Sequence, residues 1–119
     1  MTESTNDSID RATFNELQET TGAEFTAELV GTFLDEAPLL LEQLTAALSA
    51  GQSDAFRRTA HSLKTNALTF GASTLAAQAR ELEQRSIDSV NADNARPLDA
   101  LAQEYAQVAA ALKALSHVD

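Results

Sequence analysis

The sequence predicts an all-α fold, namely an antiparallel four-helix bundle with a short N-terminal capping helix. Apolar residues recur three and four positions apart along most of the chain, which is the spacing of amphipathic helices. No segment alternates between apolar and polar residues as a half-buried strand does. Ala and Leu, which favour helices, dominate the apolar residues. The 119 residues suffice for one domain, and short connections between long helices favour antiparallel neighbours.

The chain begins with a polar segment and a short helix. Residues 1–8 have no periodic pattern, so we expect a disordered tail, followed by one domain over residues 9–117. Asp10 is a suitable N-cap for a helix over residues 11–20, which Gly22 ends. The residues of this segment that should face the core are Ile9, Phe14 and Leu17.

A long amphipathic helix is predicted over residues 23–49, and Gly51 closes it. Its expected inward stripe comprises Phe25, Leu29, Phe33, Leu41, Leu44 and Leu48. Pro38 lies inside this segment and has no backbone N–H to donate to the preceding turn. We therefore expect Pro38 to kink the helix or to divide it in two.

The second half of the chain supplies three further helices. The first should run from Ser53, its expected N-cap, to Phe70, and Gly71 breaks the pattern. The next should span residues 73–86, with Leu75, Ala79 and Leu82 inward. The polar residues 88–94 are predicted to be a connection. Pro97 suits the first turn of a last helix over residues 95–116.

The composition restricts the possible partners. The net charge of −10 disfavours nucleic acids and anionic membranes as ligands. The chain contains no Cys, which excludes disulfides and thiolate metal sites. It opens without a signal-peptide pattern and has no apolar run long enough to span a membrane, so we expect a cytoplasmic protein that contacts no membrane.

The charges are unevenly distributed along the sequence. No acidic residue occurs between Asp54 and Glu81, and this window contains His61 and half of the eight basic residues. Those four basic residues are Arg57, Arg58, Lys64 and Arg80. The clustering is either chance on a solvated helix face or the sign of a site for an anionic group.

His61 is predicted to lie at the centre of the solvent face of its helix. On a helical wheel, the apolar stripe lies about 140–220° away from it or slightly more. That stripe comprises Phe56, Thr59, Leu63, Ala67 and Phe70. Five other side chains fall within about 60° of His61 on the wheel. They are Arg57, Arg58, Lys64, Thr65 and Leu68.

The residues around His61 distinguish between several roles that a histidine can have. A core histidine would share the apolar stripe, and a zinc ligand would have His, Asp or Glu one turn along, where the chain has Lys64 and Thr65. A serine-type triad would need a carboxylate, and none is nearby in sequence. Surrounding cations do suit a histidine that becomes an anion by phosphorylation, because a phosphoryl group carries close to two negative charges. The alternative is an ordinary surface histidine.

Two neighbours of this face have both structural and functional interpretations. Gly71 can be a helix end that needs a positive φ, or a position whose missing side chain lets a partner approach. Leu68 can be a solitary exposed leucine or an apolar docking point for a partner.

The string AHSLKTNALTFGA, residues 60–72, resembles the His-x-x-Lys motif of histidine-containing phosphotransfer (HPt) domains, which have a glycine ten residues after the histidine. The segment FLDEAPLLLEQLTAALSAGQSDAFRRTAHSLK is also similar to that family, and the resemblance covers residues 10–85. It implies a phospho-acceptor role for His61, phosphoryl stabilisation by Lys64, and space for a docking receiver domain at Gly71. Many members have glycine or serine where this chain has Thr65.

The resemblance implies a phosphorelay intermediate of two-component signalling. His61 would accept a phosphoryl group from the aspartyl phosphate of one receiver domain and pass it to another. The expected partners are response-regulator receivers and a hybrid sensor histidine kinase, with Arg57, Arg58, Thr65, Leu68 and Gly71 as partner-binding residues. The protein would be a monomeric covalent carrier and not an enzyme.

The resemblance also implies no bound metal or cofactor, because Mg²⁺ would belong to the receiver. Some members place a polar helper on the neighbouring helix, for which Gln78 and Glu83 are candidates. Three alternatives to a relay intermediate stay open. The chain could be a receiver-binding module that does not transfer, the N-terminal domain of a larger kinase, or a purely structural bundle.

Overall fold

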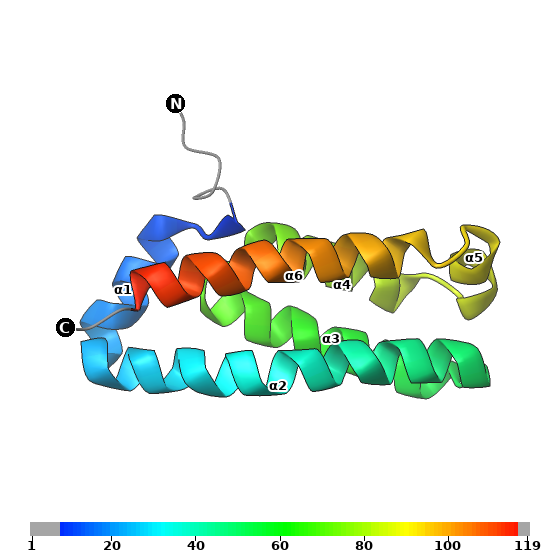
Figure 1. Ribbon diagram of the computed structural model, residues 1–119, viewed down its shortest axis with the longest axis horizontal. Helices are drawn as coiled ribbons and strands as arrows, with labels where there is room; N and C mark the ends of the chain where they lie inside the picture. The colour runs from blue at the N-terminus through cyan, green and yellow to red at the C-terminus, as the bar shows by residue number, and fades with distance from the viewer. Residues whose placement is uncertain (1–7, 117–119) are drawn as a thin grey trace, which may run out of the picture.

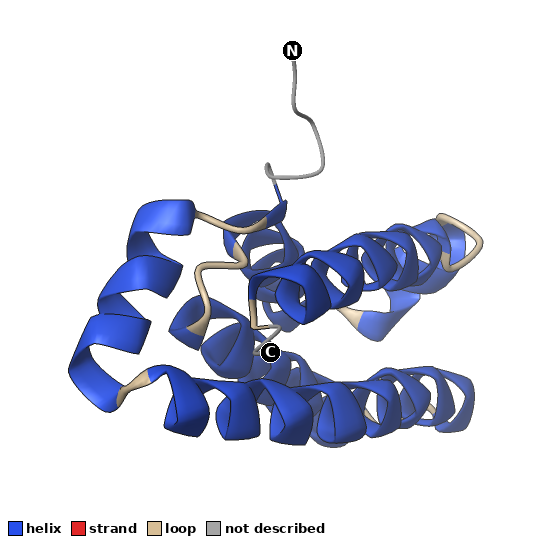
Figure 2. Ribbon diagram, turned by 60° about the vertical axis from the view of Figure 1, so that its left-hand side comes forward, coloured by secondary structure: helices blue, strands red, loops and turns tan. Residues whose placement is uncertain are grey.

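The computed structural model describes residues 8–116, and within them it contains six helices and no strand. The helices are α1 (Arg11–Thr21), α2 (Ala23–Ala50), α3 (Ser53–Thr69), α4 (Ser73–Gln84), α5 (Ile87–Ala92) and α6 (Arg96–Leu115). Figure 1 shows α2, α3, α4 and α6 side by side, each running opposite to the one before it along the chain. Figure 2 shows α1 crossing one end of this bundle and leading directly into α2. The predicted all-α class, the four-helix bundle and the capping helix are confirmed.

Several predicted helix boundaries are confirmed by their capping interactions. The Asp10 side chain accepts a hydrogen bond from the backbone N–H of Ala12 at 3.2 Å and caps α1. Gly22 ends α1 with a φ of 90°, and Gly51 ends α2 with a φ of 70°. Ser53 is the first residue of α3, whereas Gln52 is its N-cap, so the predicted capping role of Ser53 is wrong.

The start of the chain is more firmly packed than its polar composition indicates. Ser8, which the sequence assigned to the tail, is buried, and its hydroxyl donates to Oε1 of Gln107 at 3.3 Å. Ile9 is also buried, and the backbone N–H of Asp10 donates to the carbonyl of Gly71 at 2.7 Å. The remaining residues of the predicted tail, 1–7, and the C-terminal His117 lie outside the described residues.

The core fills the space between the four long helices. It contains the predicted inward residues Phe14, Phe33, Leu44 and Leu48, and the Phe33 ring lies 5.3 Å from that of Phe70. The prediction for Phe25 is wrong, because this side chain is 50% exposed at the start of α2, beyond the end of the apolar stripe. None of the helices within residues 8–116 has the length and apolar character that crossing a bilayer requires.

The connection predicted over residues 88–94 contains a short helix, α5. Ser86 caps it by accepting a hydrogen bond from the backbone N–H of Ser89 at 3.1 Å. Its two apolar residues, Ile87 and Val90, are buried against the bundle. Tertiary burial therefore supports a helix that is too short and too polar to be recognised from periodicity.

α2 is continuous through Pro38, so of the two expected effects, a kink or a division, the division does not occur. A proline leaves the carbonyl four residues earlier without its helical donor, and here that carbonyl belongs to Leu34. The hydroxyl of Tyr105 in α6 donates to the Leu34 carbonyl at 3.4 Å. Burial, and then the nearby carboxylate of Asp35, raise the pKa of Tyr105, so its hydroxyl keeps the proton that it donates. α6 thus replaces the hydrogen bond that α2 lacks.

We predict that Tyr105→Phe lowers the free energy of unfolding by about 1–2 kcal/mol, because it leaves the Leu34 carbonyl without a donor. In a Pro38→Ala background the cost should be smaller, since the backbone N–H of residue 38 can then donate to Leu34. Urea unfolding of the four proteins measures both costs in one double-mutant cycle. Equal costs in the two backgrounds would show that the hydroxyl does not compensate for the proline.

Candidate functional site

The site lies on α3, which has its apolar side against the bundle and its polar side toward solvent, as the sequence predicts. Phe56, Ala60, Leu63 and Ala67 are buried on one side, and Thr59 at the edge of this stripe is half-buried. The His61 side chain lies on the opposite side and is 56% exposed. The apolar face holds α3 against the bundle, so the imidazole faces solvent on a rigid support.

A carboxylate from α4 joins His61 and Lys64. Glu83 accepts a hydrogen bond at Oε2 from Nδ1 of His61 at 2.8 Å. Its other oxygen, Oε1, lies 3.0 Å from Nζ of Lys64. Glu83 and Lys64 are only 21% and 22% exposed, so their pair is better shielded from water than the imidazole. Lys64 therefore points along the same face as His61, as the spacing on α3 predicts.

These contacts determine the state of the imidazole. The hydrogen bond from Lys64, and then that from His61, lower the pKa of Glu83, against a smaller opposing effect of burial. Glu83 is therefore an ionised acceptor at neutral pH and cannot donate. A neutral His61 ring must then carry its proton on Nδ1, which leaves the lone pair on Nε2. The carboxylate selects the nitrogen that is free to react.

Glu83 was one of two candidate helpers in the sequence, and symmetry about the turn distinguishes them. In an antiparallel helix pair, residues at equal distances from the turn come together. His61 lies eight residues before the end of α3 at Thr69, and Glu83 lies ten residues after the start of α4 at Ser73, which are roughly equal distances from the turn. Gln78 lies closer to the turn, and it lines a surface hollow together with Pro97 and Ala100 of α6. Only Glu83 belongs to the histidine site.

Two of the cations predicted around His61 form ion pairs, which partly neutralise the positive charge of this face. Lys64 is paired with Glu83, and Nη2 of Arg57 lies 2.9 Å from Oδ1 of Asp54 in an exposed pair. Such exposed pairs contribute little to stability. A shallow depression of about 420 Å³ beside the imidazole is lined by Arg57, Arg58, His61, Ser62 and Glu83. The depression is thus mainly cationic, with one carboxylate at its edge.

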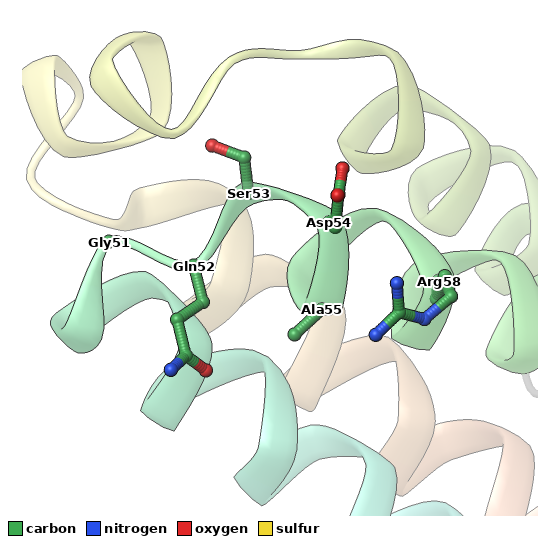
Figure 3. Close-up of a pocket in the computed structure, with 6 residues that line it drawn as sticks. All are labelled: Gly51, Gln52, Ser53, Asp54, Ala55 and Arg58. Carbon is green, nitrogen blue, oxygen red and sulfur yellow. The ribbon is translucent and has the colours of Figure 1, made fainter.

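Arg58 also lines a second hollow, of about 590 Å³, at the start of α3. Figure 3 shows this hollow, with the Asp54 carboxylate and the Arg58 guanidinium pointing in different directions from the first turns of the helix. Its other lining residues are Gly51, Gln52, Ser53 and Ala55, and His61 is not among them. Within residues 8–116, no group of three or more His, Asp or Glu residues is placed to hold a metal ion.

Thr65 and Leu68 extend the exposed face beyond His61. The hydroxyl of Thr65 donates to the backbone carbonyl of His61 at 3.1 Å. This local hydrogen bond turns the hydroxyl toward the helix backbone. Leu68 is 53% exposed and provides an apolar surface two turns after His61. Both residues lie on the histidine side of α3, as the wheel predicts.

Gly71 is buried, and its surroundings give it a packing role. Its φ is +80°, and a β-carbon built there would lie 2.9 Å from the carbonyl oxygen of Asp10 and 3.0 Å from Cβ of Thr13. The space left by the missing side chain is therefore occupied by the start of α1. Of the two interpretations of Gly71, the structure supports the helix end with positive φ, and the position is not open to a partner.

The fold and the site define a small helical protein that presents an exposed histidine on a helix packed against the bundle. The model of the Hpt domain family matches residues 28–115, and the chain belongs to this family. In structure it is similar to histidine-containing phosphotransfer protein B (HptB) from Pseudomonas aeruginosa PAO1, with a TM-score of 0.81 and 31% sequence identity over 92% of this chain and 94% of that chain. No curated protein matches it in sequence.

Family membership assigns the chain a histidine phosphotransfer role in two-component signalling. Hpt domains act as phosphocarriers rather than as enzymes, and the family implies receiver domains and kinases as partners. The resemblance seen in the sequence is therefore confirmed at the level of family, fold and general role.

We predict that Gly71→Ala lowers the free energy of unfolding more than Gly51→Ala does. Both glycines have a positive φ, at which a β-carbon costs about 1–2 kcal/mol. At Gly51 nothing lies within 4 Å of the added atom, whereas at Gly71 it meets the backbone of Asp10. Urea unfolding of the two variants compares the losses. Equal losses would show that α1 yields to the extra methyl group without cost.

Proposed function

We propose that this protein is a phosphorelay intermediate that accepts a phosphoryl group on His61 from the aspartyl phosphate of a receiver domain and passes it to another receiver. One observation supports this most directly. The imidazole is exposed, and Glu83 holds its Nδ1–H at 2.8 Å, which leaves Nε2 as a nucleophile facing solvent. The receiver can then bring its phosphorus atom in line with Nε2.

Lys64 is suited to stabilise the transferred group. Its ammonium has three donors, and the pair with Glu83 at 3.0 Å uses one of them. The others remain available for oxygens of a phosphoryl group on Nε2, where the negative charge develops. Glu83 thus orients Lys64 without exhausting its donors.

The partner surface proposed for the receiver lies around His61 on α3. Arg57 and Arg58 provide positive charge on a protein whose net charge is −10, and Leu68 provides an apolar contact. Thr65 lies between His61 and Leu68 on the same face. The acidic pocket of a receiver, with its own Mg²⁺, complements this surface better than the acidic remainder of the bundle does. Gly71 is not part of this proposal, since α1 covers it.

The proposed upstream partner is a hybrid sensor histidine kinase, whose receiver domain would supply the phosphoryl group. The carrier itself would act as a monomer and hold no metal. A module that only binds receivers would not take up a phosphoryl group. Covalent phosphorylation of this protein by a receiver therefore distinguishes the relay intermediate from such a module.

We predict that His61→Gln abolishes the uptake of acid-labile phosphate from a phosphorylated receiver, because glutamine has no nucleophilic nitrogen. The variant should fold, since the side chain is more than half exposed. Intact mass measurement after incubation with the phosphorylated receivers of the source genome detects the added phosphoryl group. Continued uptake by the variant would exclude His61 as the acceptor, and no uptake by the wild type would favour the non-transferring module.

We predict that Lys64→Ala slows phosphoryl uptake by about tenfold to a hundredfold, because one charged donor to the developing negative charge is lost. Lys113→Ala is the matched control, since Lys113 is an exposed lysine in the last turn of α6 and does not belong to the α3 face that carries His61. Rapid-quench measurement of transfer from a phosphorylated receiver gives both rates. An equal loss at Lys113 and Lys64 would contradict the assignment of the phosphoryl-stabilising residue.

A further inference from the structure

Two buried oxygen atoms at the contact between α4 and α6 have no hydrogen-bond donor. Within residues 8–116, Oε1 of Gln78 and Oε2 of Glu104 are the buried side-chain atoms that no protein group satisfies. Glu104 is only 9% exposed, so its carboxylate lies largely inside the bundle. A buried acceptor without a donor lowers stability, so each of these two atoms calls for a specific explanation.

Both acceptors lie on the same side of the molecule. Gln78 of α4 lines a surface hollow of about 370 Å³ together with Pro97 and Ala100 of α6. Glu104 lies one turn after Ala100, so its side chain leaves α6 in nearly the same direction. The two unsatisfied oxygens therefore belong to facing sides of α4 and α6, one at this α4–α6 hollow and one a turn beyond it.

The rim of the α4–α6 hollow supplies donors instead. Arg85 is held in place, because its Nη2 lies 2.7 Å from Oδ2 of Asp93 and its Nε donates to Oγ of Ser89 at 3.1 Å. These contacts leave its Nη1 group available. Arg96 is exposed and belongs to none of the four ion pairs within residues 8–116. α6 begins at Arg96 without a side-chain cap, so the partial positive charge of its N-terminus adds to that of the guanidinium groups.

The size and the charge balance of the hollow restrict what it can bind. Its volume is at the small end of the range for ligand pockets. The charged groups that line it are two guanidinium groups and the carboxylates of Glu81 and Asp93, so their formal charges cancel. A compound with both a positive and a negative group matches this balance better than a simple anion or cation does. Pro97 and Ala100 provide a small apolar surface for the rest of the ligand.

We propose that the α4–α6 hollow binds a small aliphatic α-amino acid, with its ammonium group toward Gln78 and Glu104 and its carboxylate at the guanidinium groups of the rim. An ammonium has three N–H donors, which suit two acceptors that lack a donor. A guanidinium pairs well with a carboxylate. This inference does not depend on the role of His61, because the hollow shares no lining residue with the depression beside the imidazole.

L-Alanine is the probe that tests the inference, and propionate and ethylamine are its matched controls, because each of them lacks one of the two charged groups. Nitrogen-15 NMR of the full chain during a titration reports binding residue by residue. With L-alanine we expect saturable shifts at Gln78, Arg85 and Arg96 and a dissociation constant of about 1 mM, as suits so few atoms. Propionate and ethylamine should bind at least about tenfold more weakly, since each loses one set of charged hydrogen bonds.

Three variants of the full chain locate the site. Arg96→Gln removes a guanidinium of the rim, and Gln78→Met replaces the inner amide with an apolar side chain of similar length. Arg80→Gln is the control, since Arg80 is an exposed arginine of α4 that does not line the hollow. The first two changes should each raise the dissociation constant for L-alanine by about tenfold or more, and the control should leave it unchanged.

The inference is overturned if L-alanine causes no saturable shift at the hollow, or if propionate or ethylamine binds as well as L-alanine does. It is also overturned if Arg96→Gln binds L-alanine with the same dissociation constant as Arg80→Gln and the wild type. Should Gln78→Met fail to fold, Arg96→Gln decides, because Arg96 is exposed and its side chain supports no core contact. Failure of the proposed phosphorelay function would not change any of these titrations.

Discussion

The close antiparallel packing of α3 on α4 is the constraint on which the site depends. Small side chains make the contact possible, because Ala60, Ala67 and Ala72 are fully buried, and Ala76 and Ala79 nearly or fully so. Gly71 reverses the chain in a left-handed conformation, and α1 packs on it. This geometry brings Glu83 beside His61, although twenty-two residues separate them in sequence. The chemistry of the imidazole thus follows from the packing of two apolar stripes.

The face of α3 could be predicted because it depends on one helix only. A period of 3.6 residues places His61 opposite Leu63 and Ala67, and no neighbouring element alters that result. The carboxylate partner depends on two helices and the turn between them. The break at Gly71 marks the turn in the sequence, but the alignment of α4 along α3 decides between Gln78 and Glu83, and local spacing on one helix cannot supply that alignment.

Other departures from the sequence analysis have the same origin. Pro38 leaves the Leu34 carbonyl without a donor within α2, but the donor that replaces it comes from Tyr105, seventy-one positions after Leu34. Gly71 suits a partner surface or a helix end equally well until Asp10 is seen to occupy the space beside it. α5 is stabilised by burial of Ile87 and Val90. In each case a contact between distant segments outweighs the local pattern.

The link between Tyr105 and Leu34 also bears on how the bundle assembles. α2 is complete in sequence long before α6 is synthesised, yet its carbonyl at Leu34 obtains a donor only from that last helix. In a chain that ends before Tyr105, the Leu34 carbonyl near the middle of α2 therefore has no hydrogen-bond donor from the protein. Docking of the C-terminal helix supplies that donor, so the longest helix gains this hydrogen bond only when the last element of the bundle is in place.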